Sequence, residues 1–129
     1  ANFGKLGFHQ GFGTTITLPR VIGAQKAKLM LLTSKRINGE EAYNIGLADY
    51  FVERLQLINK AKELSNEINM SGPLGIQAIR NTLNQGLVDK IEEAVKIEAR
   101  EQNILRKTSD FKEGIDASIN RRDPQFKGI

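Results

Sequence analysis

The sequence predicts a mainly α-helical chain, with at most one or two short strands near the N-terminus. From residue 53 onward, apolar residues recur at spacings of three and four, the period of a helix that turns one face to a core. Glycine and proline divide this stretch into segments joined by short turns, a pattern typical of a helical bundle or layer. The 129 residues are 40% hydrophobic and 26% charged, which excludes a disordered chain.

The N-terminal region predicts a loop followed by a short helix. Four glycines make residues 1–13 a brief extended piece and then a loop, because glycine disfavours a continuous helix. Thr14 or Thr15 is expected to cap the helix that follows. Pro19 keeps this helix short or bent, and Gly23 ends it.

Two more helices and one strand are expected before residue 53. Residues 24–33 predict a helix with an apolar side and exposed lysines. Residues 38–41 read Asn-Gly-Glu-Glu, and acids in a first turn favour a helix start there; Gly46 is its expected end. Residues 47–52 are short, apolar and partly alternating, which predicts a brief strand.

The remainder predicts four helices. The first carries one apolar stripe over residues 57–68, and the second begins at Pro73, a favoured first position. Residues 90–108 are expected to form the longest helix. Ser109 or Asp110 is expected to cap the last one. The apolar residues expected to be buried in that last helix are Phe111, Ile115 and Ile119.

Charge is unevenly distributed along the chain. The net charge is +4, yet residues 1–39 contain no Asp or Glu at all. A glycine-rich loop with basic neighbours and no carboxylates suits an anionic ligand, because backbone N–H groups can approach an oxyanion closely. The alternative is a solvated basic face beside a flexible loop.

Composition also excludes several classes of function. There is no cysteine and only one histidine, His9, so neither a disulfide framework nor a metal site is expected. The longest apolar stretch, residues 29–32, is far short of the roughly 20 residues of a membrane span. No secretory signal is visible, and we expect a cytoplasmic protein, or one of an organelle matrix in a eukaryote. Nucleic-acid binding is not expected, because the basic third holds neither tyrosine nor a recognised motif.

Several motifs together resemble one known family. Residues 5–23, KLGFHQGFGTTITLPRVIG, are similar to the middle of the crotonase family, the enoyl-CoA hydratase/isomerase superfamily. The resemblance continues in order with Leu-Leu-Thr-x-x-x-Ile and Glu-Ala-x-x-x-Gly-Leu-Ala. The later segments that carry it are residues 71–74, 110–114 and 121–127.

The resemblance covers only the C-terminal half of that family's ββα spiral fold. It implies that residues 1–52 form the end of the core, with the glycine loop and an active-site wall. Residues 53–129 would then form a helical trimerisation region. We therefore expect a fragment whose missing N-terminal half is a partner. We also expect a homo-oligomer, either a trimer or a dimer of trimers.

The resemblance further implies acyl-CoA as substrate. A thioester carbonyl would be held by two backbone N–H groups, which stabilise an enolate, with no cofactor beyond the coenzyme A thioester itself. One N–H group belongs to the missing half. The two places at which family members carry a catalytic carboxylate are Phe3 and Gly11 here, so neither acid is present. His9 could replace the lost acid, or have no catalytic role.

The expected substrate contacts lie at both ends of the chain. Phe3, which is equally readable as a core aromatic, is expected to line the pocket together with Gly11 and Phe12. The resemblance implies that Phe126 and Lys127 approach the adenine and phosphate of coenzyme A, where a ring can stack and an ammonium can pair. Without the resemblance, the same residues read as a frayed, solvated tail. Lys5 and Arg20 are further candidates for phosphate contacts, although Arg20 also suits a structural role.

Two functions therefore stay open. The first is a crotonase-family enzyme, whose isolated C-terminal half is expected to be inactive. The second is a non-catalytic helical oligomerisation or CoA-binding module. The upstream reading frame distinguishes them, because an enzyme needs a preceding glycine-rich β/α half.

Overall fold

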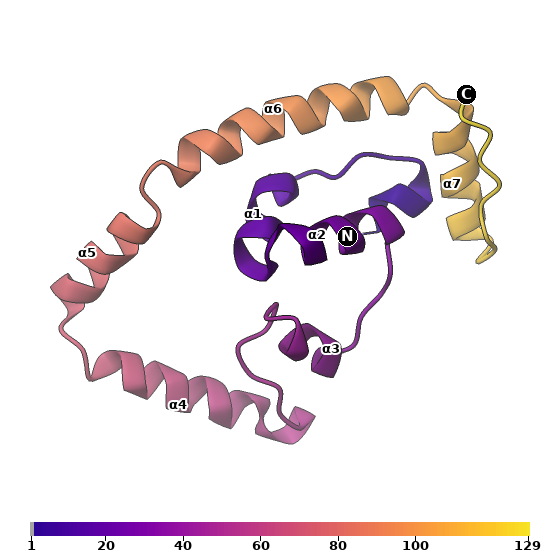
Figure 1. Ribbon diagram of the computed structural model, residues 1–129. Coiled ribbons are helices and arrows are strands. Elements are labelled where there is room, and N and C mark those ends of the chain that lie inside the picture. Colours follow the sequence, from indigo (N-terminus) through magenta and orange to yellow (C-terminus); the bar gives the residue numbers. More distant parts are fainter. Residues whose placement is uncertain (1) are drawn as a thin grey trace.

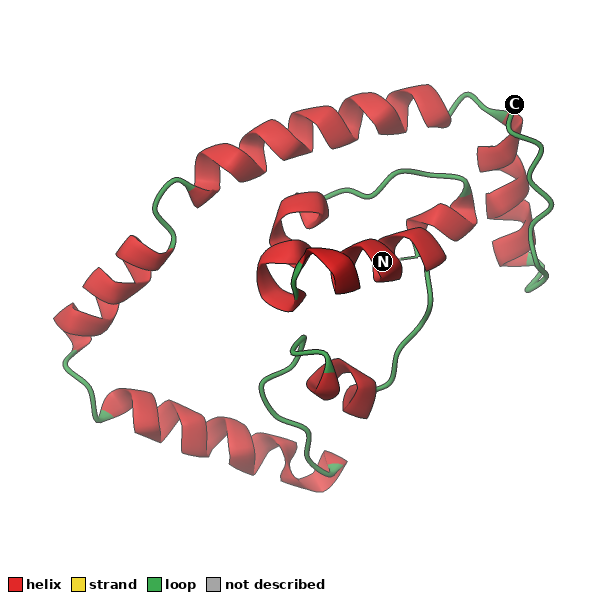
Figure 2. Cartoon of the chain, in the orientation of Figure 1, coloured by secondary structure: helices red, strands yellow, loops and turns green. Residues whose placement is uncertain are grey.

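The computed structural model describes residues 2–129, and all regular secondary structure within them is helical (Figure 2). The chain opens with a short 3₁₀ turn, η1 (Phe3–Leu6), and a second one, η2 (Arg54–Gln56), leads into the later helices. The seven α-helices in this part of the chain are α1 (Thr14–Ile22), α2 (Ala24–Thr33), α3 (Gly39–Asn44), α4 (Leu57–Asn69), α5 (Pro73–Leu83), α6 (Leu87–Leu105) and α7 (Ser109–Ile119).

Most helix boundaries follow from local sequence, as predicted. The start of α3 is a capping box, in which the Asn38 side chain accepts from the Glu41 N–H and the Glu41 carboxylate accepts from the Asn38 N–H. Pro73 occupies the first turn of α5, where its missing N–H costs nothing. The predicted caps of α1 and α7 were each displaced by one residue or more. Gly13 precedes α1, and Thr108 caps α7 by accepting from the Phe111 N–H.

The predicted strand at residues 47–52 is wrong. This segment forms turns and an extended loop between α3 and η2. A strand is stabilised by hydrogen bonds to a neighbouring strand, and residues 2–129 supply none. An apolar, partly alternating run of six residues is therefore not enough to form one.

Of the two expected arrangements, a bundle or a layer, the bundle does not form within residues 2–129, although the helices themselves are present. Figure 1 shows α4, α5 and α6 following one another in an open arc around α1 and α2. Close packing in the described residues is concentrated where α1 meets α2 and α6, and where η1 meets α2 and α7. Short turns fix which helices are consecutive, but here they do not fold them back on one another.

The core is small and lies in the N-terminal third. Leu18 and Ile22 of α1 pack against Ala27 of α2, and Met30, Leu31 and Ile45 cover them in part. Pro19 lies inside α1, and this helix is short, ending three residues later at Ile22, as the proline predicts. Among residues 2–129, no helix has both the length and the apolar character needed to cross a membrane.

The two ends of the chain meet where η1 packs on α7. Gly114 is buried there, and a Cβ at this position would overlap the backbone of Leu6. Gly7 has φ +61°, and a Cβ on it would lie 2.6 Å from the Asp110 carbonyl oxygen. The buried face of α7 is thus Gly114 and Ala117. The predicted burial of Ile115 and Ile119 is wrong, because that face of α7 points away from η1.

Candidate functional site

The glycine loop at residues 7–13 is held against the long helix α6. The Gln102 side-chain amide donates to the carbonyl oxygens of His9 and Gln10, at 3.1 and 3.2 Å. One turn earlier on the same face of α6, Glu98 accepts hydrogen bonds from the end of the loop. The loop, the expected wall of an active site, is therefore fixed by two side chains from a helix some 90 residues away in sequence.

Glu98 is a buried carboxylate at the N-terminus of α1. It is 2% exposed and accepts from the Gly13 N–H at 2.8 Å and from the Thr15 N–H and hydroxyl at 3.1 and 2.6 Å. Burial alone would raise the pKa of Glu98, but these hydrogen bonds, with the nearby His9 ring, outweigh it and lower the pKa. Both of its oxygens accept hydrogen bonds, and its charge faces the positive end of α1. Glu98 is thus suited to holding the loop rather than to moving a proton.

The structure places the loop residues that are expected to contact substrate in different environments. Gly11 is buried, and a Cβ there would lie 2.9 Å from the Gln102 amide nitrogen, so this position admits no carboxylate without displacing Gln102. Phe12, with φ +63°, is 86% exposed and projects from the loop. The His9 ring is partly buried, with Nδ1 2.8 Å from the Gln10 carbonyl oxygen. Gly11 and Phe12, although adjacent, therefore face different surroundings.

Phe3 belongs to an aromatic cluster that joins the two ends of the chain. Its ring centroid lies 6.2 Å from that of Phe8, which in turn lies 4.7 Å from Phe111 of α7. The Arg106 guanidinium lies over the Phe8 ring at 5.6 Å. Such tilted aromatic pairs add to the stability gained from burying the rings. In the described chain, Phe3 accordingly packs as a structural aromatic while still lying at the start of the predicted wall.

The C-terminal tail is held in place rather than frayed. The Asp110 carboxylate accepts from the backbone N–H groups of Lys127 and Gly128, both at 2.8 Å. The Ile129 carbonyl oxygen accepts from the N–H and hydroxyl of Ser109, at 2.9 and 2.6 Å. Residues 127–129 thus occupy the N-terminal end of α7.

This arrangement brings Phe126 beside the N-terminal residues. Phe126 is 42% exposed and lines an open cleft of about 380 Å³ together with Gly4, Gly7 and Phe8. The cleft is mostly apolar, and Leu105 closes another side. Phe126 and the start of the glycine loop therefore border one cavity, whereas Gly11 and Phe12 do not line it.

An ion-pair network fixes the turn that leads into the tail. Arg122 donates to both oxygens of Glu113, at 2.5 and 2.7 Å, and to Asp116 at 2.6 Å. Glu113 also accepts from the Gln125 N–H at 2.8 Å. The Arg122 guanidinium and this N–H hold the pKa of Glu113 down at about 2. The charge of Arg122 is therefore neutralised by ion pairs with Glu113 and Asp116.

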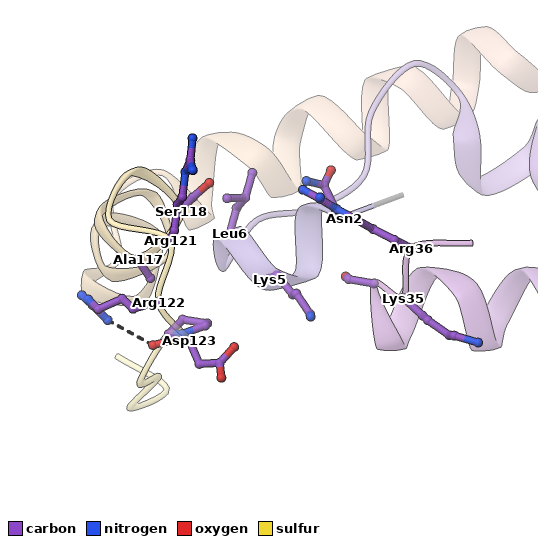
Figure 3. A pocket seen from close by; sticks show the side chains of 12 residues that line it. Asn2, Lys5, Leu6, Lys35, Arg36, Ala117, Ser118, Arg121, Arg122 and Asp123 are labelled. Carbon is purple, nitrogen blue, oxygen red and sulfur yellow. Dashed lines mark hydrogen bonds between the residues drawn. The ribbon is translucent and has the colours of Figure 1, made fainter. Parts of the chain in front are cut away.

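The acid-free N-terminal segment borders a second, basic cleft. Figure 3 shows Lys5 extending from η1 between the end of α7 and the segment that carries Lys35 and Arg36. This basic cleft has a volume of about 820 Å³ and takes Arg121 and Arg122 from its α7 side. Arg20, the other candidate for a phosphate contact, lies elsewhere: its guanidinium donates to the Leu83 carbonyl oxygen at the end of α5.

Two residues of the loop's support, Glu98 and Gln102, were not singled out from the sequence. A signal was present, because both fall on the inward face of α6 marked by Ile91, Ala94 and Leu105. Polar residues at core positions of an amphipathic helix require partners, since a buried polar group without one is costly. The sequence could have predicted this need, but not the loop that meets it.

Comparison with known proteins gives one consistent result. A family described as enoyl-CoA hydratase/isomerase matches residues 1–129. The chain is 35% identical over 130 residues to a crotonyl-CoA hydratase of Syntrophomonas wolfei, covering 98% of this chain and 50% of the relative. It is 34% identical to the putative enoyl-CoA hydratase/isomerase YngF of Bacillus subtilis, covering 92% of this chain and 46% of the relative.

Solved structures share the arrangement of the helices. An enoyl-CoA hydratase of Mycobacterium avium subsp. paratuberculosis superposes with a TM-score of 0.87 at 22% identity, over 98% of this chain and 52% of that protein. At this identity the likeness shows the fold alone. The chain spans about half the length of the curated relatives it matches.

Proposed function

The chain belongs to the enoyl-CoA hydratase/isomerase family, and from this membership we propose that it is the C-terminal half of an enzyme acting on acyl-CoA thioesters. The observation that carries the proposal is the match itself, which covers 92–98% of this chain and about half of each relative. The partner is then a β/α half that completes the core. The proposed location is the cytoplasm, or an organelle matrix in a eukaryote.

The surface of the later helices supports an assembly with further chains. Monomeric proteins rarely expose extended apolar surface. Here α4, α5 and α6 each expose several large apolar side chains, namely Leu57, Ile58, Ile68, Leu74, Ile79, Leu83, Val88, Val95, Ile97 and Ile104. We propose that residues 53–129 cover these faces in a homo-oligomer, either a trimer or a dimer of trimers, and that residues 1–52 form the end of the catalytic core.

The chemistry proposed for the complete enzyme is stabilisation of an enolate beside a thioester carbonyl. Backbone N–H groups would hold the carbonyl oxygen, with one of them supplied by the other half. Within residues 2–129, no carboxylate is positioned at the loop for proton transfer, because positions 3 and 11 are Phe and Gly and both oxygens of Glu98 accept hydrogen bonds. The proton-transferring acid or base would therefore come from the other half.

The proposed coenzyme A contacts are Phe126 and Lys127. The tail is anchored through its backbone, so the Lys127 ammonium remains available to pair with phosphate. The half-exposed Phe126 ring, at the apolar cleft, is available for stacking on adenine. On the core side, Phe3, Gly11 and Phe12 stay proposed as wall residues.

The test of this proposal is to add an N-terminal half to the chain. The chain alone and the chain mixed with the N-terminal half of the Syntrophomonas wolfei relative are assayed for hydration of crotonyl-CoA and for double-bond isomerisation. We expect no turnover by the chain alone, and a stable complex with the added half on size exclusion. The matched control is the added half by itself. Turnover by the isolated 129 residues, or the absence of any complex, contradicts the proposal.

The anchored tail and the occupied carboxylate of Glu98 also fit a second function. A chain whose tail, the proposed coenzyme A contact, is ordered but whose loop presents no free acid suits a non-catalytic CoA-binding or oligomerisation module. This alternative predicts coenzyme A binding without turnover even when the other half is present. An upstream reading frame without a β/α half would favour it.

A further inference from the structure

The basic cleft between η1, the end of α2 and the end of α7 is lined by a buried serine whose hydroxyl is unpaired within residues 2–129. Ser34, the residue after α2, is 3% exposed, and its hydroxyl has no hydrogen-bond partner in the described residues. It lines the basic cleft, so close to η1 that a Cβ on Gly4 would lie 2.8 Å from its Oγ. Buried hydroxyls are nearly always paired, so this one calls for a partner from outside the described residues.

The charges around this hydroxyl are predominantly positive. Five of the side chains lining the cleft are basic and one, Asp123, is acidic. Two of the five are already neutralised within the chain, because Lys35 pairs with Glu41 at 2.9 Å and Arg122 with Glu113 and Asp116. The other three, Lys5, Arg36 and Arg121, make no ion pair within residues 2–129.

These three cations come from different walls of the cleft. Lys5 extends from η1, Arg36 follows α2, and Arg121 follows α7 (Figure 3). Their separation favours a ligand with more than one negative group over a single small anion. Arginine and lysine are the usual partners of phosphate, and a serine hydroxyl adds a neutral donor. The volume of about 820 Å³ is large enough for a drug-sized ligand.

We propose that the basic cleft binds a small molecule carrying two or more phosphate groups, with Lys5, Arg36 and Arg121 as charged contacts and the Ser34 hydroxyl as a donor. The site is separate from the tail at Phe126 and Lys127, neither of which lines it. The proposal does not depend on acyl-CoA turnover. Three of the six basic residues of the acid-free segment 1–39 line this cleft.

The test is calorimetric titration of the 129-residue chain with inorganic pyrophosphate at low ionic strength. We expect saturable binding that weakens as salt is added, because the contacts are solvent-accessible ion pairs. Lys5→Gln and Arg36→Gln should each raise the dissociation constant about fivefold or more. The matched control is Lys62→Gln on α4, an exposed lysine outside the cleft, which should leave binding unchanged.

Ser34→Gly separates ligand binding from folding. Ser34 has φ +51°, a conformation that glycine adopts without strain, and the substitution removes a buried unpaired hydroxyl. The variant should therefore be at least as stable as the parent chain, yet bind pyrophosphate about threefold or more weakly. Unchanged binding of pyrophosphate by Ser34→Gly would show that the Ser34 hydroxyl does not contact the ligand.

Parallel titrations with coenzyme A and 3′-dephospho-coenzyme A identify the source of the phosphate. If Lys5→Gln weakens the binding of coenzyme A as well as that of pyrophosphate, the ligand class includes the coenzyme A portion of the proposed substrate. If it weakens pyrophosphate alone, the cleft recognises another phosphate compound, and the proposal still stands. No binding of pyrophosphate at millimolar concentration, or equal weakening by Lys62→Gln, would overturn it.

Discussion

The Glu98 carboxylate of α6 accepts a hydrogen bond from the backbone N–H of Gly13 at 2.8 Å, across 85 residues of sequence. The same carboxylate accepts from the N–H and hydroxyl of Thr15, so it serves as the cap that α1 lacks in its own sequence. The glycine loop ends at this contact. One buried side chain thus sets both the start of α1 and the distance between the loop and α6.

Replacing Glu98 should therefore destabilise the chain. Glu98→Ala leaves the buried Gly13 donor and the partly buried Thr15 donors without an acceptor, and we expect a loss of about 2–3 kcal/mol in the free energy of unfolding. Urea denaturation followed by circular dichroism measures it. Glu92→Gln, on an exposed face of α6, is the matched control and should change stability by less than about 0.5 kcal/mol. Equal effects from both substitutions would contradict the capping role.

The ion pairs of Arg122 predict a pH dependence near the C-terminus. The pKa of Glu113 is about 2 in the folded chain against an ordinary value of 4.5. Because the folded pKa is the lower one, the unfolded chain binds the proton first. The stability contributed by Glu113 is therefore present above pH 4.5 and is lost as the pH falls toward 2.

NMR titration of the Glu113 side-chain carboxyl carbon measures this value directly. In Arg122→Gln the midpoint should move up toward 4.5, because the guanidinium is the main cause of the lowered pKa. In Lys112→Gln, which removes a neighbouring positive charge that does not bond to Glu113, the midpoint should change little. An unchanged midpoint in Arg122→Gln would show that the ion pair does not form in solution.

Two glycines in helices should respond oppositely to alanine. Gly114→Ala places a methyl group into the backbone of Leu6, and forcing η1 and α7 apart should cost about 1–3 kcal/mol. Gly75→Ala in α5 meets open space and should raise stability by about 0.5–1 kcal/mol, because alanine favours the helix. Chemical denaturation of both variants provides the comparison. Equal changes would mean that η1 does not pack on α7.

The tail that carries Phe126 and Lys127 should be released by loss of Asp110. In Asp110→Ala the N–H groups of Lys127 and Gly128 lose their acceptors, so we expect faster hydrogen exchange at both amides. Coenzyme A should then bind more weakly, since the ligand must order the tail again. Asp123→Asn removes a carboxylate from the same end of the chain and is the control. Unaltered exchange at residues 127 and 128 would contradict the anchoring.

Self-association should depend on the exposed apolar faces of the later helices. At micromolar concentration we expect the chain to sediment as an oligomer, because covering these faces removes apolar surface from water. Ile79→Glu on α5 should shift the mass toward that of the monomer without lowering helical content, because Ile79 is exposed in the single chain. Gln77→Glu adds the same charge on the same helix. A monomeric parent chain would contradict the expectation.

Local sequence by itself determined the helices and the family resemblance. Caps, glycines and prolines act within a few residues, so residues such as Asn38, Glu41 and Pro73 specify their helices without reference to the rest of the chain. The predictions were wrong where the conformation of a segment depends on the segments packed against it. Residues 47–52 have no strand to pair with in the described chain, and consecutive helices form an arc because their apolar faces are not turned toward one another.

Only the tertiary structure decided which distant groups meet. Glu98 could pair with the glycine loop, and Asp110 with the tail, only after α6 and α7 had been placed against the N-terminal segment. The same packing brought Lys5, Lys35 and Arg36 beside the end of α7, with the Ser34 hydroxyl among them. The local sequence sets the charge and the apolar period of one helix. A functional site requires several elements in fixed relative positions, and these positions are set by which faces of the elements bury each other.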